Sequence, residues 1–270
     1  MKDKTRIDPI LMRKTILKMA YSGSSVHIGC AFSLVELVAV LYSKFIRIDK
    51  DNLKSNDRDI LALSKGHGVM ACYAALFQKG IVSSEEIESY FQDGSKLKGL
   101  SSVHCPGIEV SGGSLGHGIT VATGIALADK LRGSRTRNVF VIVGDGEINE
   151  GSAWECFLFA AHHSLRNLVV IVDANSYQAM GRSEDVLNLE PLKAKFEAFG
   201  FECCEVDGHS ESSIEETLNF LLSSKLQTPK ALVARTVKGK GISFMESNNV
   251  WHYSRLDKET LERSLSELEP

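Results

Sequence analysis

The chain has 270 residues, of which 43% are hydrophobic and 24% charged, and its formal net charge is −3. The composition is ordinary for a globular protein, and the length provides an ample core. The weak negative charge gives no reason to expect a nucleic acid or an anionic membrane as partner, and no apolar run approaches the ~20 residues that span a bilayer.

The first half of the chain alternates helical periodicity with short apolar runs. Apolar residues over 9–20 recur at helical spacing. Ser33 and Glu36 have capping-box spacing, so a helix is expected to open at Ser33 and to run through LVELVAVLYSKF; SSEEIESYFQ has the same pattern. A buried strand over 59–64 should precede Gly-His-Gly and the helix VMACYAALFQKG. A small-residue helix, ITVATGIALADKL, should follow the glycine-rich EVSGGSLGHG.

The second half contains two continuous apolar runs of strand length, NVFVIVG over 138–144 and NLVVIVD over 167–173. Such runs, separated by a helix, indicate parallel strands buried on both faces. FECCEV, a helix near 212–222 and ALVART continue the alternation. We therefore expect a three-layer α/β fold, a doubly wound, mostly parallel sheet with helices on both faces, as a single domain over 1–270. Only the stretch near 243–258 is expected to be an irregular excursion.

The cysteines and the N-terminus bear on location. None of the six cysteines forms a CxxC pair and most lie in apolar runs, which indicates reduced, mainly buried thiols and argues against a zinc site. The N-terminal stretch MKDKTRIDPILMRK is charged and lacks the apolar region of a secretory signal. We expect a cytoplasmic protein.

The stretch VIVGDGEINEGSAWE places Asp145 between two glycines at the end of the first apolar run. Ligands of parallel sheets bind beyond the carboxyl ends of the strands, and glycines let a ligand approach the backbone closely. A turn in which the aspartate only caps the next helix would have the same sequence pattern. The sequence around Asp145 alone leaves both interpretations open.

The second apolar run places further oxygen ligands at the tip of a neighbouring strand. It ends VDANSYQAMG, so Asp173 and Asn175 should lie at the tip of a neighbouring strand. The carboxylate of Asp145, the amide oxygen of Asn175 and a backbone carbonyl would be three hard ligands, and a diphosphate and a water could complete the octahedron that Mg²⁺ requires. Because the protein supplies one formal charge, this would be a phosphate-bridging ion.

At this point the sequence resembles a known family. GDGEINEG followed by VDAN is similar to the thiamin-diphosphate motif, and SSVHIG, LSKGHG, GGSLGHG and KGKGISFMESNNVWH resemble further motifs of transketolase in the same order. Each motif is weak alone, whereas five in order are specific. The resemblance covers nearly the whole chain and corresponds to the N-terminal, diphosphate-binding half of transketolase.

The resemblance implies a role for each matching residue. It implies that Asp145, Asn175 and the Tyr177 carbonyl bind Mg²⁺ (or Ca²⁺ or Mn²⁺) and that His27 faces the substrate, where it could polarise a carbonyl or relay a proton. Imidazoles suit the diphosphate because they donate to phosphate oxygens. The further residues implied are His67 and His252 at the diphosphate, Gly146 and Glu147 at the diphosphate through their N–H groups, Gly113, Ser114 and Leu115 along the cofactor rings, and Glu150 and Glu155 at a dimer interface that links two cofactors.

Two departures from the family pattern change the expectations. Transketolases usually have Gly-His-Pro before the glycine-rich turn, whereas here KLKGLSSVHCPGIEV offers His104, or an ungapped alignment places Gly99 there and leaves the substrate-facing role empty. The chain also ends at Pro270, after the diphosphate-binding half. In the family, a glutamate of the other half activates the cofactor. The resemblance therefore implies a separate C-terminal-type subunit that supplies the pyrimidine-binding half and this glutamate, in an α₂β₂ assembly.

The function implied is transfer of a two-carbon ketol unit from a ketose to an aldose. Alternatives with the same cofactor are the α-type subunit of a 2-oxoacid dehydrogenase or an activity like that of deoxyxylulose-phosphate synthase. A nicotinamide dehydrogenase would need GxGxxG directly after the first strand, and GSLGHG has the wrong spacing. A cofactor-binding protein without catalysis is the non-enzymatic alternative.

Overall fold

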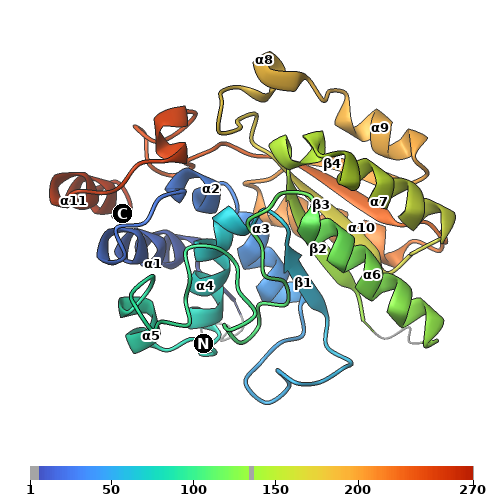
Figure 1. Cartoon of the computed structure of the whole chain (residues 1–270), viewed down its shortest axis with the longest axis horizontal. Coiled ribbons are helices and arrows are strands. Elements are labelled where there is room, and N and C mark those ends of the chain that lie inside the picture. Colours follow the sequence, from blue (N-terminus) through green and yellow to red (C-terminus); the bar gives the residue numbers. More distant parts are fainter. Residues whose placement is uncertain (1–5, 134–136, 270) are drawn as a thin grey trace.

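The computed structural model describes residues 6–133 and 137–269. Within these ranges a five-stranded, wholly parallel sheet has the order β1-β2-β3-β5-β4, and helices lie on both of its faces (Figure 1). The strands are β1 (Ile60–Leu63), β2 (Val139–Gly144), β3 (Leu168–Ala174), β4 (Glu202–Asp207) and β5 (Lys230–Arg235). The predicted doubly wound α/β fold is confirmed.

The helices alternate with these strands along the chain. The α-helices are α1 (Pro9–Ser22), α2 (Ile28–Phe32), α3 (Val35–Val40), α4 (Val69–Gln78), α5 (Ser84–Glu88), α6 (His117–Leu131), α7 (Gly151–His162), α8 (Ser183–Leu187), α9 (Leu192–Ala198), α10 (Glu211–Ser223) and α11 (Lys258–Ser266). A π-helical turn η1 (Leu41–Phe45) extends α3, and the short 3₁₀ turns in the described part of the chain are η2 (Gly66–Gly68), η3 (Gly146–Asn149) and η4 (Asn249–His252). None of the helices in the described ranges combines the length and apolarity that crossing a bilayer requires.

The sheet has a separate hydrophobic core on each face because alternate residues of a strand point to opposite sides. Phe140 and Ile142 of β2 pack with α1, α3, α4 and α10, whereas Val139, Val141 and Val143 pack with α6, α7 and α9. The strands β2 and β3 are buried along their whole length, as expected for the central strands of a parallel sheet. Because neighbouring strands all pair in parallel, their carboxyl ends lie at one edge of the sheet.

The expected helix start at Ser33 is wrong. Ser33 lies at the C-terminal end of α2, and its hydroxyl donates to Cys30 O and to Asp173 Oδ2, 2.7 Å away. The Glu36 carboxylate accepts from Arg13 and contacts His209. Both side chains that would form a capping box therefore have partners distant in the sequence, and α3 begins without a side-chain cap.

The segment predicted to be irregular, near 243–258, contains only the η4 turn before α11 begins at Lys258. Met245 is fully buried, and Trp251 packs edge-on against Phe244 with ring centroids 5.6 Å apart. Asn249 Nδ2 donates to Ala179 O at 3.2 Å. These contacts hold η4 close to the carboxyl edge of the sheet.

Candidate functional site

The carboxyl ends of β1, β2 and β3 bring the predicted residues to one edge of the sheet. His67 follows β1, Asp145 follows β2 and Asn175 follows β3. In the β2–β3 register Gly144 pairs with Asp173, so Asp145 lies one residue and Asn175 two residues beyond the last paired positions. The sequence alone gives strand ends, and the parallel register places the two side chains next to each other.

Asp145 and Asn175 are both buried and share a hydrogen-bonded loop. Asp145 Oδ2 accepts from the Ser176 N–H at 2.7 Å and from Ser183 Oγ at 3.0 Å, while Oδ1 accepts from the Gly146 N–H at 2.8 Å. Asn175 Oδ1 accepts from the Tyr177 N–H at 3.0 Å. Asp145 thus caps η3, as the simpler interpretation expected, and its carboxylate also holds the loop that follows Asn175.

Asp173 is the buried anchor beneath this loop. Its carboxylate accepts from Lys65 Nζ, from the Thr236 hydroxyl, from Ser33 Oγ and, at 2.9 Å, from Asn175 Nδ2. Because the amide nitrogen of Asn175 is bound to Asp173, its oxygen must face the other way, towards Tyr177 and the loop. Asp173 therefore orients the oxygen that the sequence assigns to the metal.

The charges at this edge shift one another's protonation. Burial, followed by the charge of Asp173, raises the pKa of Asp145 to about 6. Burial opposes ionisation of Asp173 itself, but the Lys65 ammonium together with the hydroxyls of Thr236 and Ser33 outweighs it and lowers the pKa of that carboxyl below its usual value. A cation placed against Asp145 would favour its charged form.

Glu147 ties three segments together through its side chain. The carboxylate accepts from the Ser64 hydroxyl, from the Gly116 N–H at 2.9 Å and from the Gly144 N–H at 3.1 Å. Gly116 is in the left-handed region, with φ of 79°, at the start of α6. The sequence assigned only the backbone N–H of Glu147 to the cofactor, and its carboxylate additionally positions the glycine-rich turn beside η3.

Three histidines from distant parts of the chain meet at the same edge. The His27 ring lies 4.7 Å from the His67 ring and 5.5 Å from the His252 ring, centroid to centroid, and 5.6 Å from the ring of Tyr253. His27 has a φ of 67°, in the left-handed region, directly before α2. All three imidazoles are half-buried, so His27 is not simply a core residue packed on a helix.

The environment of the three imidazoles disfavours their protonated form. Burial, with the charges of His67 and Lys238, lowers the pKa of His27 to about 4; burial, with Lys238 and the other histidines, lowers that of His252 to about 3. Burial and Lys65 also lower the pKa of His67. An anionic ligand between the rings would reverse the electrostatic part of these shifts.

Two buried lysines at this edge were not assigned a role from the sequence. Lys65 pairs with Asp173, and Lys238, which is fully buried, donates to Asn249 Oδ1 at 3.1 Å and lies 2.7 Å from His252 Nδ1. Both lie inside the quoted motifs, LSKGHG and KGKG. A lysine within a motif rich in glycine and histidine was the feature of the sequence that could have identified both as site residues.

Other predicted residues lie apart from this cluster. His104 is exposed and has no contact with the histidine cluster in the described structure; the side chain that flanks Gly113 is Leu100, whose Cδ1 would lie 2.7 Å from a Cβ built on that glycine. Glu150 and Glu155 are exposed at the start of α7 and one turn into it. Ser114 and Leu115 lie in the turn that Gly116 ends.

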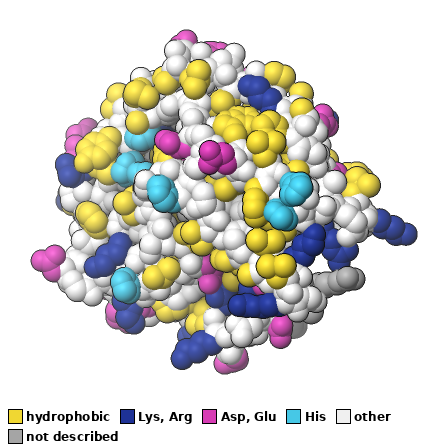
Figure 2. Space-filling model, turned by 45° about the vertical axis from the view of Figure 1, so that its right-hand side comes forward, with side chains coloured by type: hydrophobic (Ala, Val, Ile, Leu, Met, Phe, Trp, Pro, Cys, Tyr) yellow, Lys and Arg dark blue, Asp and Glu magenta, His cyan; other side chains and the backbone are white. Residues whose placement is uncertain are grey.

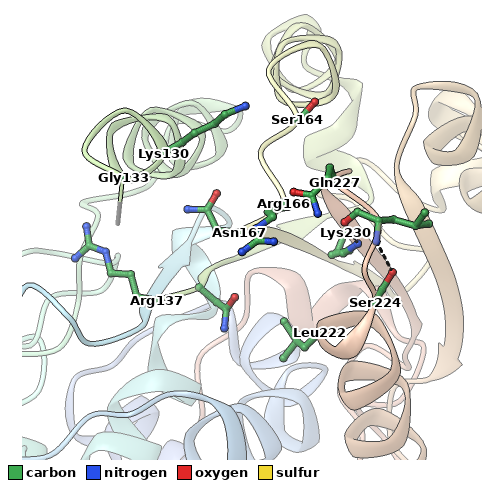
Figure 3. Close-up of a pocket in the computed structure, with 12 residues that line it drawn as sticks. Lys130, Gly133, Arg137, Ser164, Arg166, Asn167, Leu222, Ser224, Gln227 and Lys230 are labelled. Atoms are coloured by element: carbon green, nitrogen blue, oxygen red, sulfur yellow. Dashed lines mark hydrogen bonds between the residues drawn. The ribbon is translucent and has the colours of Figure 1, made fainter. Parts of the chain in front are cut away.

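A cavity of about 600 Å³ lies at the opposite, amino edge of the sheet (Figure 3). Lys130, Arg137, Arg166 and Lys230 line it, together with residues at the C-terminal ends of α6 and α10. Cations at helix C-termini complement the helix dipoles, and Lys130 Nζ donates to a carbonyl just beyond the end of α7. A smaller cavity of about 260 Å³ includes Asp145. The larger cavity contains none of the predicted site residues.

Comparison with known proteins identifies similar chains. The family described as transketolase, thiamine diphosphate binding domain, matches residues 11–268. One subunit of the apulose-4-phosphate transketolase of Actinobacillus succinogenes is 38% identical over 259 residues, which cover 96% of this chain and 93% of that protein. The 6-deoxy-6-sulfo-D-fructose transketolase subunit SqwG of Clostridium sp. is 35% identical over 248 residues, covering 90% and 88%.

Solved structures of longer proteins share the fold. The transketolase from Campylobacter jejuni superimposes with a TM-score of 0.91 at 26% identity, over 98% of this chain and 42% of that one. The chain thus spans less than half the length of these solved proteins and about nine tenths of the relatives that are named as transketolase subunits.

Proposed function

The chain belongs to the transketolase family through its thiamine-diphosphate-binding domain, and on this basis we propose that it is the diphosphate-binding subunit of a two-chain transketolase. The reaction is transfer of a two-carbon ketol unit from a ketose to an aldose through thiamin diphosphate. The observation that carries the proposal is the convergence of Asp145, Asn175 and three histidines at the carboxyl edge of one parallel sheet. Two relatives of similar length are each named as one subunit of an apulose-4-phosphate transketolase, which supports a second chain.

The residues at this edge fit a metal-bound diphosphate. Asp145, the amide oxygen of Asn175 and the Tyr177 carbonyl would hold Mg²⁺ or a similar divalent cation, because hard oxygen ligands suit it. His67, His252 and the N–H groups of Gly146 and Glu147 would hold the diphosphate. Lys65 and Lys238 add positive charge nearby. The bound cofactor supplies the reactive carbon that accepts and releases the ketol unit.

The glycine-rich turn would lie along the cofactor rings. Gly113, Ser114 and Leu115 precede the left-handed Gly116, which Glu147 holds in place. His27, at the centre of the histidine cluster, would face the substrate, where a neutral imidazole can move a proton to or from a sugar hydroxyl. We propose that His104 contacts the substrate farther from the histidine cluster than His27 does, since His104 is exposed and lies outside that cluster.

The α6 and α7 face suits contact with a second copy of the chain. Val121, Leu158 and Phe159 are 44%, 58% and 41% exposed there, and Glu155 lies on the same helix as the last two. Figure 2, in which the side that carries these helices comes forward, shows hydrophobic side chains gathered beside acidic and histidine ones. We propose that two copies meet through this face, with Glu150 and Glu155 at the contact, and that two C-terminal-type subunits complete an α₂β₂ assembly. The partner would supply the pyrimidine-binding half and the activating glutamate.

We propose a cytoplasmic location, because the six cysteines are free, as is usual for proteins of a reducing compartment.

Thiamin diphosphate binding is measured by calorimetry with and without Mg²⁺, first for the chain alone and then with its co-purified partner. Asp145→Ala should abolish the Mg²⁺-dependent part of binding with the fold intact, whereas Asp51→Ala, at an exposed aspartate, should leave it unchanged. Unaltered affinity in Asp145→Ala would contradict the site.

The two-chain arrangement has its own test. Ketol transfer is assayed over several ketoses for the chain, for the partner and for the mixture. We expect activity from the mixture alone. Full turnover by the isolated chain would contradict the need for a partner, and no turnover by any mixture that binds the cofactor would favour a cofactor-binding protein without catalysis.

A further inference from the structure

Lys238 is a buried ammonium whose described contacts are neutral groups. It is fully buried in the loop after β5, and its Nζ contacts Asn249 Oδ1 at 3.1 Å and His252 Nδ1 at 2.7 Å. Its Nζ also lies 5.9 Å from the centroid of the Tyr177 ring. It forms no ion pair within the described ranges. A buried charge normally has a charged partner, so this arrangement needs an explanation.

Burial lowers the pKa of Lys238 below its usual value, and the charges of Asp145 and Asp173 oppose this. With Lys238 charged, its contact with His252 Nδ1 sets where the imidazole proton lies. A lysine ammonium has three donors and no acceptor, so a hydrogen bond from it requires a lone pair on His252 Nδ1. In a neutral imidazole the single proton is then on Nε2. The depressed pKa of His252, about 3, means that the ring does not take a second proton near neutrality. Nε2 is therefore an N–H donor.

We propose that Lys238 is a positioning residue that holds His252 in its Nε2–H tautomer, so that this ring offers a hydrogen-bond donor to an anionic phosphate oxygen. The proposal rests on the proposed function for the identity of the anion. Phosphate oxygens only accept hydrogen bonds, so the opposite tautomer would direct a lone pair at the anion and weaken binding. Lys238 thereby acts on the diphosphate through His252 in addition to its own charge.

The same lysine orients the amide of Asn249. Because Asn249 Oδ1 accepts from Lys238, its Nδ2 faces the other way and donates to Ala179 O at 3.2 Å. Ala179 lies in the loop that follows Tyr177, the third predicted metal ligand. Lys238 and Asn249 thus join the segment that carries His252 to the loop that carries Tyr177. The loop that carries Tyr177 and the segment that carries His252 are therefore held together.

The tautomer can be read in the chain without cofactor. ¹⁵N-histidine labelling distinguishes a protonated from an unprotonated ring nitrogen by chemical shift, and His252→Gln assigns the signals. We expect an unprotonated Nδ1 and a protonated Nε2 in the wild type. Lys238→Met should lose this preference, Lys238→Arg should keep it because arginine is also a donor only, and Lys240→Met, a matched change at a half-exposed neighbour, should have no effect.

Binding of inorganic pyrophosphate and of thiamin diphosphate, each with Mg²⁺, gives the second measurement. Lys238→Met should weaken both about 10-fold or more, as expected for the loss of a hydrogen bond to a charged group, and Lys238→Arg should restore most of the affinity. Loss of affinity alone could reflect the missing charge of Lys238. The ¹⁵N measurement of the His252 tautomer therefore decides whether Lys238 positions the ring. Circular dichroism and thermal melting establish that each variant is folded.

The outcomes separate this proposal from the proposed function. A protonated Nδ1 in the wild type, or an unchanged tautomer in folded Lys238→Met, overturns the positioning role. If Lys238→Met does not fold, loss of the Nε2–H tautomer in Lys238→Arg overturns it in the same way, and retention supports it. A wild-type chain with the expected tautomer that binds pyrophosphate but not thiamin diphosphate would refute the proposed cofactor and leave the role of Lys238 standing.

Discussion

The buried Lys65–Asp173 pair should be among the most destabilising places to remove a charge. The Lys65 and Asp173 side chains are 8% and 0% exposed. Asp173→Asn keeps the shape but leaves the ammonium of Lys65 without its counter-charge, and breaking a buried pair in this way typically costs about 3–5 kcal/mol. The substitution should also free Asn175 from its anchor, because an amide can present a donor where the carboxylate only accepts.

Urea denaturation of the purified chain measures this effect. We expect the free energy of unfolding of Asp173→Asn to fall by about 3–5 kcal/mol. Glu197→Gln, the same chemical change in the exposed Lys193–Glu197 pair, should cost less than about 1 kcal/mol. Lys65→Met combined with Asp173→Asn should lose less than the sum of the two single changes, because each change removes the charge that the other would leave unpaired.

One result would refute this reasoning. If Asp173→Asn is as mild as the exposed control, Lys65 must find another counter-charge or water, and the pair is not the anchor described above. A second readout addresses the link to the metal loop. Mg²⁺-dependent binding of thiamin diphosphate should weaken in folded Asp173→Asn, and an unchanged Mg²⁺ requirement would show that Asn175 is oriented independently of Asp173.

Three further changes test the turn, the histidine cluster and the apolar face. Gly116→Ala, at the N-cap of α6, should destabilise the chain by more than about 1 kcal/mol, because φ is 79° and the new Cβ would clash with Ser152 Oγ. Gly124→Ala within α6, where a Cβ meets open space, should stabilise the chain by about 0.5–1 kcal/mol, both measured by urea denaturation. The pKa of His27, about 4, and that of His252, about 3, lie below 6.5, so at these rings the unfolded chain binds more protons and their contribution to the free energy of unfolding decreases as the pH falls from 6.5 towards 4. Asp145, whose pKa is raised to about 6, acts in the opposite direction, so the measurement is the difference between the wild type and His27→Gln. The wild type should lose stability relative to His27→Gln as the pH falls, and a difference that does not change with pH would contradict the burial of the ring. Leu158→Asp should shift the sedimentation of the complex towards a single copy of this chain, and an unchanged profile would exclude the α7 face as the contact.

The sequence by itself determined which segments are strands and at which edge of the sheet the site residues lie. Continuous apolar runs require burial on both faces, and this favours parallel pairing, so Asp145 and Asn175 had to emerge at the same edge of the sheet. Even the capping box at Ser83 and Glu86 was readable, because all of its hydrogen bonds lie within four residues. Features set by local hydrogen bonds and by periodic burial were therefore predictable.

Only the tertiary structure decided which partners the other polar groups take. Ser33 and Glu36 have the same spacing as the real capping box, yet Asp173 binds the first, and Arg13 and His209 bind the second. These partners are 23 to 173 residues away. No local pattern encodes such distances, because they depend on how helices and strands pack.

The two buried lysines show the same division. Their motifs were visible, but their roles depend on the folded chain, in which Lys65 is paired with Asp173 and Lys238 contacts the ring of His252. Burial turns an ordinary cation into one that must satisfy a specific acceptor, since water is no longer available to solvate it. Residue types and strand ends come from the sequence, whereas the protonation and orientation of the site come from the packing around it.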